Sequence, residues 1–161
     1  MRTRLEIGSF APNARGFTLI ELVIVVVMIA ILSALAFPSM RSFIVRNRVR
    51  DAASDIFIAL NQARSEALKR NVTITLTPIT AGTWTSGWHV ADPVNAGQYL
   101  EVHQPLQVLT MTGPANVRYQ STGRLAAAVA AFNISASSGS YTASARVAID
   151  PSGRPYITEA L

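Results

Sequence analysis

The 161-residue chain has no cysteine and only two histidines, and these shortages exclude most metal and thiol chemistry. Without cysteine it has no disulfide, no thiolate nucleophile and no sulfur ligand for a metal ion. His89 and His103 have no obvious carboxylate partner nearby in the sequence, so we expect surface or structural roles for them. No nucleophile elbow, glycine-rich phosphate loop or convincing pair of catalytic carboxylates is present. We therefore predict a protein that is not an enzyme and that holds no metal or cofactor.

Charged residues are also scarce, at 14% of the chain, and residues 17–37 contain a single one, Glu21. The same stretch has neither glycine nor proline. As a helix rising 1.5 Å per residue it spans roughly 30 Å, the thickness of a bilayer core. The sequence therefore predicts a membrane-spanning helix over residues 17–38. A carboxylate inside such a helix is costly, so Glu21 requires a partner or a function.

A short basic leader precedes the apolar stretch. Residues 1–16 carry Arg2, Arg4 and Arg15 against one acid, Glu6. A secretory signal peptide would be cut after the apolar stretch, but the nearest candidate site there, residues 33–36, fits poorly. Charge alone leaves the orientation in the membrane undecided, because arginines also follow the stretch. These are Arg41, Arg46, Arg48 and Arg50.

Residues 16–22 read Gly-Phe-Thr-Leu-Ile-Glu-Leu and resemble the processing motif of type IV prepilins and type II secretion pseudopilins. The resemblance implies that a prepilin peptidase cuts after Gly16 and that Phe17, the new N-terminus, is N-methylated. It also implies an inner-membrane protein with a cytoplasmic N-terminus, a single span and a periplasmic head. The implied partners are the membrane itself, other pilins or pseudopilins and the inner-membrane assembly platform.

The same resemblance implies that Glu21 pairs with the terminal amine of a neighbouring subunit in a filament. A buried carboxylate and a buried ammonium each lose several kcal/mol of hydration, which only close pairing offsets. A subunit displaced along the helix would leave two unpaired charges, so the pair would fix the register of assembly. In an isolated subunit, Glu21 can instead extend to the nearby membrane surface.

Residues 39–71 predict an amphipathic helical arm. Its apolar positions recur at spacings of three and four residues and form one stripe. The stripe comprises Val45, Val49, Ala52, Ile56, Leu60, Ala63 and Ala67. The polar surfaces comprise Arg46, Arg50, Asp51, Asp55, Gln62, Arg64, Glu66, Lys69 and Arg70. Pro38, just before the arm, predicts either a kink or an end of the first helix at Phe37.

Residues 72–161 read as a β-rich globular head. Apolar and hydroxyl residues alternate over residues 72–77, which is typical of a half-buried strand. Further candidates are residues 87–91, 99–103, 106–110, 117–120, 131–135, 143–149 and 155–158. The predicted fold is α+β and type IV pilin-like, a long N-terminal helix packed on a small antiparallel β-sandwich. With no disulfide, the head must depend on packing against the arm.

Several short motifs resemble the GspH/FimT branch of minor pilins and pseudopilins. They are Asn47-Arg48, residues 63–67, Arg70-Asn71, Ser86-Gly87-Trp88, Ser121 to Arg124 and Ser152 to Arg154. The resemblance to this branch covers the chain from end to end, and it is strongest before Val72 and weaker in the head. The branch implies a type II secretion protein H-like subunit that assembles into a pseudopilus or a type IV pilus, at or near the tip. The alternative is a FimT-like minor pilin that binds DNA for uptake in natural transformation.

DNA-binding members of this branch resemble one another in a C-terminal Gly-Arg-x-Arg element. Residues 153–156 keep the first arginine, Arg154, but have Tyr156 in place of the second. Arg154 would contact phosphate and Tyr156 would stack on a base. Further positive charge would come from Arg118, Arg124 and Arg146 if they share a face. The competing interpretation is that Gly153 and Arg154 only turn a hairpin.

A third interpretation, a membrane-anchored enzyme or adhesin, would need a ligand pocket. Trp84, Trp88 and Tyr99 are the aromatic cluster that would line one. We expect instead that Trp88 lies in the core and that Trp84 lies at a turn.

Overall fold

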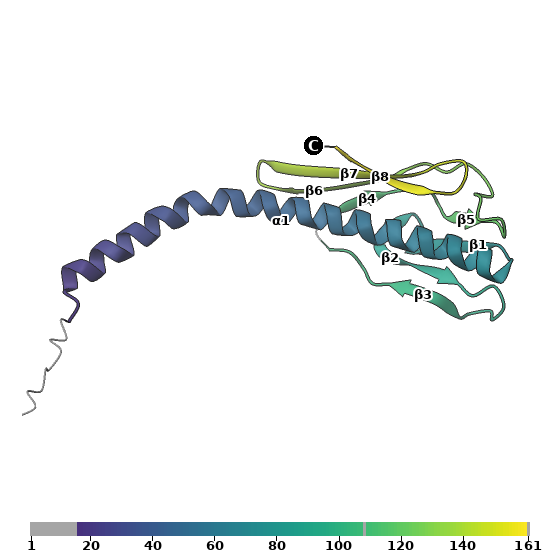
Figure 1. Ribbon diagram of the computed structural model, residues 1–161, viewed down its shortest axis with the longest axis horizontal. Helices are drawn as coiled ribbons and strands as arrows, with labels where there is room; N and C mark the ends of the chain where they lie inside the picture. Colours follow the sequence, from purple (N-terminus) through teal and green to yellow (C-terminus); the bar gives the residue numbers. More distant parts are fainter. Residues whose placement is uncertain (1–15, 108, 161) are drawn as a thin grey trace, which may run out of the picture. The chain divides into compact units, whose positions relative to one another are not determined.

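The computed structural model describes residues 16–107 and 109–160, with the backbone alone for residues 34–39, 159 and 160. Over these residues the chain forms one helix, α1 (Leu19–Arg70), followed by eight strands (Figure 1). It divides into two compact units, Met1–Pro38 and Ser39–Leu161. All of the predicted leader except Gly16 lies outside the described residues.

In the first unit, α1 begins at Leu19, and every large apolar side chain from Leu19 to Leu32 is exposed. The helix continues through Pro38, so the alternative in which it ends at Phe37 is wrong. Proline removes one backbone hydrogen bond, and at this position that loss does not end the helix. Among the described residues, no helix is both long and apolar enough to cross a membrane. The crossing expected over residues 17–38 stays a prediction.

In the second unit, α1 buries the predicted apolar stripe completely. All seven stripe residues are 0–3% exposed, and Ala53 and Ala59 extend the buried surface. The helix ends in a Schellman motif, in which Asn71 takes a left-handed φ of 54°. The N–H of Val72 then donates to the carbonyl oxygen of Ala67 at 3.3 Å. This ending turns the chain back along the helix and into the first strand.

The strands form two four-stranded antiparallel sheets that pack on the head half of α1 (Figure 1). The first has the order β3-β2-β1-β5, with β1 (Ile74–Thr80), β2 (Thr83–Ala91), β3 (Tyr99–His103) and β5 (Val117–Tyr119). The second has the order β4-β6-β7-β8, with β4 (Thr110–Thr112), β6 (Phe132–Ser138), β7 (Tyr141–Ile149) and β8 (Pro155–Ala160). In Figure 1, β2 and β3 lie on one side of α1, and β6, β7 and β8 lie on the other.

Aromatic side chains join the two sheets. Trp84 of β2 meets Phe132 of β6 edge-on, with ring centroids 4.8 Å apart, and Trp88 lies 6.3 Å from Trp84. All three side chains are fully buried. The prediction that Trp88 lies in the core is confirmed, whereas the prediction that Trp84 lies at a turn is wrong. β2 begins at Thr83, so Trp84 points inward from a strand.

The strand expected over residues 106–110 is also wrong in position, because β4 begins only at Thr110. β3 belongs to one sheet and β4 to the other. Between these two strands, the N–H of Leu106 donates to the carbonyl oxygen of Thr85 in β2, at 2.9 Å. Leu106 and Leu109 pack against the core and so give this segment the apolar pattern of a strand. Its described residues before Thr110 are nevertheless not paired with a strand.

Candidate functional site

The N-terminal motif forms the first turn of α1. Thr18 is the N-cap residue, and its hydroxyl oxygen accepts a hydrogen bond from the N–H of Glu21 at 3.3 Å. Thr18 and Glu21 therefore have the spacing of a capping box, in which an acid at the third helical position also favours the positive end of the helix dipole. The capping role of Glu21 was not predicted, although its signal, Thr-x-x-Glu before an apolar run, is present in the sequence.

The predicted processing residues are accessible. Among the described residues other than its chain neighbours, no atom lies within 4 Å of the position that a Cβ would take on Gly16, and the Phe17 side chain is 79% exposed. Glu21 is exposed as well, and in the part of the chain that the structure describes it has no ion-pair partner. Gly16, Phe17 and Glu21 are therefore exposed to solvent in the described part of the chain.

Two loops of the head share a sequence pattern and a hydrogen-bond pattern. They are residues 120–124, Gln-Ser-Thr-Gly-Arg, and residues 150–154, Asp-Pro-Ser-Gly-Arg. In each loop, the N–H of the first residue donates to the arginine carbonyl oxygen, at 2.9 Å and 3.0 Å. The glycine N–H donates back to the carbonyl oxygen of the first residue, at 2.8 Å and 2.9 Å. Gly123 and Gly153 have φ values of 73° and 86°, a conformation that favours glycine.

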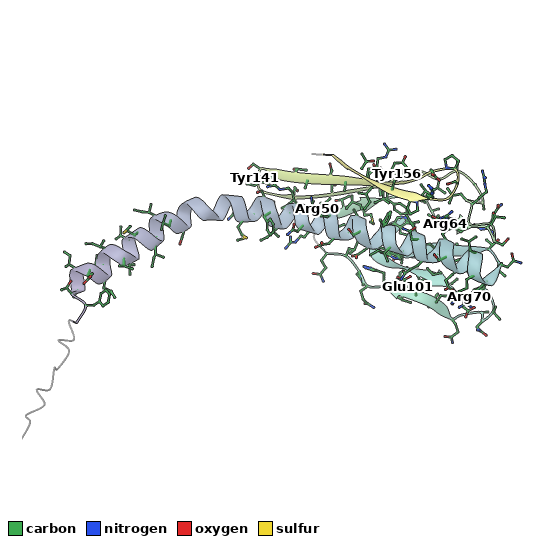
Figure 2. The ribbon with its side chains drawn as sticks, viewed as in Figure 1. Arg50, Arg64, Arg70, Glu101, Tyr141 and Tyr156 are labelled. Carbon is green, nitrogen blue, oxygen red and sulfur yellow. The ribbon has the colours of Figure 1, made fainter. Side chains whose placement is uncertain are left out.

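These two loops, which we call the paired arginine loops, pack directly against each other. A Cβ on Gly153 would collide with the carbonyl oxygen of Gly123 and would lie 3.3 Å from the Cα atom of Arg124. Arg64 of α1 holds the first loop, because its Nε donates to the same carbonyl oxygen of Gly123 at 2.9 Å (Figure 2). Arg64, which was predicted on the polar surface of the arm, is half-buried at this contact.

The paired arginine loops bring together two of the four predicted DNA-binding arginines, Arg124 and Arg154, both of them exposed. Arg118 and Arg146 are exposed at outward-facing positions of β5 and β7, which belong to different sheets. Among the described residues, neither Arg124 nor Arg154 takes part in an ion pair. The structure therefore offers one close pair of arginines and two separate ones.

Asp150 organises the second loop. Its Oδ1 accepts hydrogen bonds from the Ser152 hydroxyl at 2.7 Å and from the Arg154 N–H at 2.9 Å. The Ser152 hydrogen bond, followed by that from the Arg154 backbone, holds the pKa of the Asp150 carboxyl below its usual value. The carboxylate also lies close enough to offset part of the Arg154 charge, which weakens any attraction of this loop for anions.

Replacing Gly153 by alanine is expected to destabilise the head by about 2–4 kcal/mol. A left-handed φ costs an L-residue roughly 1–2 kcal/mol, and the collision with the Gly123 carbonyl adds the cost of moving one loop. Gly82→Ala is the matched control, because Gly82 has a φ of 75° but no atom within 4 Å of its Cβ position. Thermal unfolding followed by circular dichroism checks both, and equal losses would show that the loops do not press on each other.

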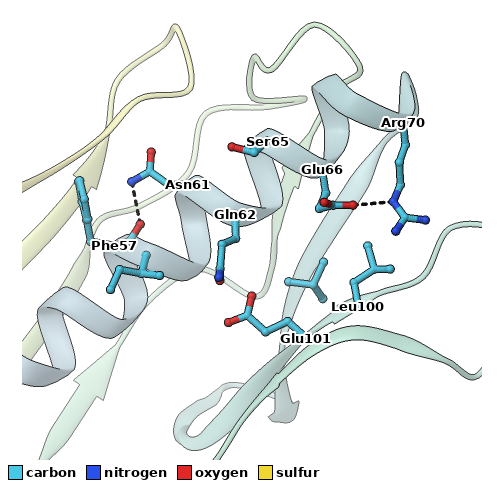
Figure 3. A pocket seen from close by; sticks show the side chains of 10 residues that line it. Phe57, Asn61, Gln62, Ser65, Glu66, Arg70, Leu100 and Glu101 are labelled. Carbon is cyan, nitrogen blue, oxygen red and sulfur yellow. Dashed lines mark hydrogen bonds and ion pairs between the residues drawn. The ribbon is translucent and has the colours of Figure 1, made fainter.

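A groove of about 520 Å³ lies between α1 and the strands β2 and β3 (Figure 3). Glu66 on its rim accepts a hydrogen bond from Nε of Arg70 at 2.6 Å, which lowers the pKa of Glu66. Across the groove, burial raises the pKa of Glu101. With the oxygen and nitrogen of its amide group exchanged, Gln62 donates from its amide nitrogen to the Glu101 carboxylate. Both carboxylates are engaged by neighbouring donors, which fits a packing surface better than an acid–base site.

The two histidines have structural positions, as expected. Nε2 of His103 lies 3.3 Å from Oδ2 of Asp55 on α1, and its ring stacks on Trp88 with centroids 4.0 Å apart. The ring of His89 lies 4.4 Å from that of Tyr99, and burial lowers the pKa of His89. Because Tyr99 is exposed while both tryptophans are buried, Trp84, Trp88 and Tyr99 do not line a common pocket.

Comparison with known proteins finds relatives of the N-terminal segment and of the arm and head. Residues 12–37 match the family model described as the prokaryotic N-terminal methylation motif. The type IV major pilin protein PilA of Myxococcus xanthus (strain DK1622) is 42% identical over 52 residues. The matched region is 32% of this chain and 24% of PilA, so it spans about a quarter of that relative.

Two crystal structures of the type IV minor pilin FimU of Pseudomonas aeruginosa (strain PAO1) have a similar fold. One has a TM-score of 0.57 at 19% identity and covers 70% of this chain and 90% of FimU. The other has a TM-score of 0.54 at 18% identity and covers 68% and 91%. This likeness confirms the predicted α+β, type IV pilin-like fold.

A second family model covers most of the arm and the head. It is described as type II transport protein GspH and matches residues 52–153, more than half of the chain. Together with the methylation motif and the FimU fold, it confirms the resemblance on which the family assignment was based. The chain therefore belongs to the GspH family of pilin-like type II transport proteins.

Proposed function

We propose that this chain is a minor pilin or pseudopilin with a structural role, a subunit that assembles into a type IV pilus or a secretion pseudopilus. The observation that carries the proposal is the contrast along α1. Its apolar side chains are exposed from Leu19 to Leu32, whereas the stripe from Val45 to Ala67 is buried under the head. An exposed apolar surface of this length requires a lipid or protein environment. The membrane supplies it before assembly, and the helices of neighbouring subunits supply it afterwards.

In this proposal the N-terminus is cytoplasmic, a single span crosses the inner membrane, and the head lies in the periplasm. A prepilin peptidase removes residues 1–16, and Phe17 becomes the N-methylated end of the mature chain. The assembly platform in the inner membrane then moves the subunit into the filament, at or near the tip. The exposed Gly16 and Phe17, next to a helix that is already capped by Thr18, support this order of events.

The test is co-expression with a prepilin peptidase, followed by intact-mass measurement of the purified chain. We expect loss of residues 1–16 and gain of one methyl group on Phe17, and we expect the Gly16→Val variant to keep the full 17.3 kDa mass. In sheared filaments from a cell that also makes the other pilins or pseudopilins, this chain should then occur only in its processed form. An uncut wild-type chain, or its absence from filaments, would contradict the proposal.

A second candidate function, DNA capture, is favoured by one observation, the contact between the paired arginine loops. The side chains of Arg124 and Arg154 extend from backbone segments that lie side by side. One phosphate group, or two successive ones, can therefore contact both guanidinium groups. Tyr156 follows on β8 and is 52% exposed, as stacking on an unpaired base would require. The offsetting charge of Asp150 and the separation of Arg118 from Arg146 make this the weaker candidate.

For DNA capture, we expect the full chain in a non-ionic detergent to bind short single-stranded DNA, and Arg154→Ala to weaken that binding. Losing one phosphate contact should reduce the slope of log K against log salt concentration by about 0.7. Arg118→Ala is the matched control, since Arg118 is an exposed arginine of the same head that lies outside the paired arginine loops. An electrophoretic mobility shift titration checks this, and an equal loss in both variants would indicate diffuse charge attraction without a site.

A further inference from the structure

A second groove, of about 470 Å³, lies between the first turns of the arm and the beginning of β7. Its basic groups come from Arg46 and Arg50 on α1, and its hydroxyl groups come from Tyr141, Thr142 and Ser144 on β7. Figure 2 shows Arg50 and Tyr141 on these two elements. Val45 and Val49, both buried, form its apolar base. Guanidinium and hydroxyl donors around an apolar base are the groups that bind a phosphate ester with a hydrocarbon part.

All the charged residues in this part of the helix are positive. Residues 41–50 carry four arginines and no acid, and Asp51 is the first acid to follow. Arg46 donates from Nε to the Ser42 carbonyl oxygen at 3.3 Å and from Nη2 to the Ser42 hydroxyl at 3.0 Å. Both acceptors are neutral, and none of Arg41, Arg46 and Arg48 forms an ion pair within the described residues. Arg46 therefore brings to the groove a positive charge that forms no ion pair among the described residues.

We propose that this groove binds the phosphate of an anionic phospholipid headgroup at the periplasmic surface of the membrane. The inference rests on the proposed membrane anchoring, because Ser42 follows Phe37, the end of the apolar stretch, by five positions. A chain anchored by residues 17–37 keeps the groove near headgroups, where basic residues are attracted to anionic lipid. The guanidinium group of Arg46 binds the phosphate oxygens, and the hydroxyl groups of β7 donate from the other wall.

Such a site would act before assembly. A subunit in the membrane would have its head held against the bilayer by the lipid, and entry into the filament would have to release it. The ligand is a lipid and not a soluble anion because the positive charge and the apolar base occur together, a few positions in sequence after the apolar stretch. The groove thus gives this part of the head a lipid-binding role that is distinct from filament contacts.

The test uses the full chain in nanodiscs of phosphatidylcholine, alone or mixed with phosphatidylglycerol. Amide hydrogen exchange is measured in peptides that cover residues 42–50 and 141–145, with peptides from β1 and β2 as the control for folding. We expect exchange in both groove segments to be about fivefold slower with phosphatidylglycerol, as one arginine at an anionic surface would produce. Arg46→Gln should abolish this protection, and Arg46→Lys should keep part of it.

Arg48→Gln is the matched control, because Arg48 has the same charge in the same segment but does not line the groove. Equal losses in the Arg46 and Arg48 variants would overturn the site in favour of diffuse attraction. Protection by inorganic phosphate in pure phosphatidylcholine nanodiscs would overturn the lipid as the ligand. Protection that is the same in both lipids would overturn the inference but leave the anchoring intact. A chain that fails to enter nanodiscs of either composition would refute the anchoring as well.

Discussion

Replacing Trp84 by alanine is expected to destabilise the head by about 3–5 kcal/mol, enough to leave much of it unfolded at physiological temperature. Trp84 is fully buried, touches Phe132 of the opposite sheet edge-on and donates from Nε1 to the Pro114 carbonyl oxygen at 2.7 Å. The alanine variant loses the contact between the sheets and leaves that carbonyl group without its donor. No disulfide exists to hold the sheets together in its absence.

The measurement is thermal unfolding by circular dichroism, where we expect the midpoint to fall by more than about 10 °C. Phenylalanine substitutions separate packing from hydrogen bonding, because the indole nitrogen of Trp88 is buried without a partner among the described residues. Trp84→Phe removes the hydrogen bond to Pro114, whereas Trp88→Phe removes a buried N–H group that forms no hydrogen bond within the described part of the chain. Trp84→Phe should therefore cost roughly 1–3 kcal/mol more. A larger loss in Trp88→Phe would show that the hydrogen bond from Trp84 to Pro114 contributes little to the stability of the head.

The helical half of this fold was readable from the sequence, because its signals are local. An uninterrupted apolar run and a stripe at helical spacing depend only on residues three or four positions apart. The stripe from Val45 to Ala67 is accordingly buried as predicted. The strands were found for the same reason, since alternation is local as well. A sandwich of two sheets was predicted, but which strands belong to each sheet was not, because pairing joins segments far apart in sequence.

The errors occur where distant residues decide the structure. Trp84 was predicted to lie at a turn, yet its indole belongs to a core that β6 completes. Arg64 reads as a surface residue until the loop that contains Gly123 is placed over it. His103 finds its carboxylate on α1, at Asp55, and not in the neighbouring sequence. The contact between the paired arginine loops was not predicted either, because it joins residues about 30 positions apart. The sequence does show that both loops contain Ser/Thr-Gly-Arg, but this pattern alone does not indicate a contact between them.

Replacing Glu21 by alanine is expected to reduce the amount of this chain in filaments by more than about 100-fold, while insertion and processing continue. A buried ammonium that loses its carboxylate costs about 3–5 kcal/mol, and each 1.4 kcal/mol is a factor of ten in an equilibrium. The measurement compares the processed chain in sheared filaments with that in membranes. Intact mass should show that cleavage after Gly16 is unchanged, since the cut lies before the helix and Gly16 is exposed.

The capping box offers a competing explanation, because Glu21 also stands at the third position of α1 and its N–H donates to Thr18. Two variants separate the roles. Thr18→Ala removes the cap and costs the first turn about 1 kcal/mol, but it keeps the charge of Glu21. Glu21→Gln keeps a capping-box side chain but removes the charge. If pairing with a neighbouring amine drives assembly, Glu21→Gln resembles Glu21→Ala, and Thr18→Ala still assembles. If Thr18→Ala fails as completely, the acid acts on its own helix, and register must be set by contacts elsewhere along α1.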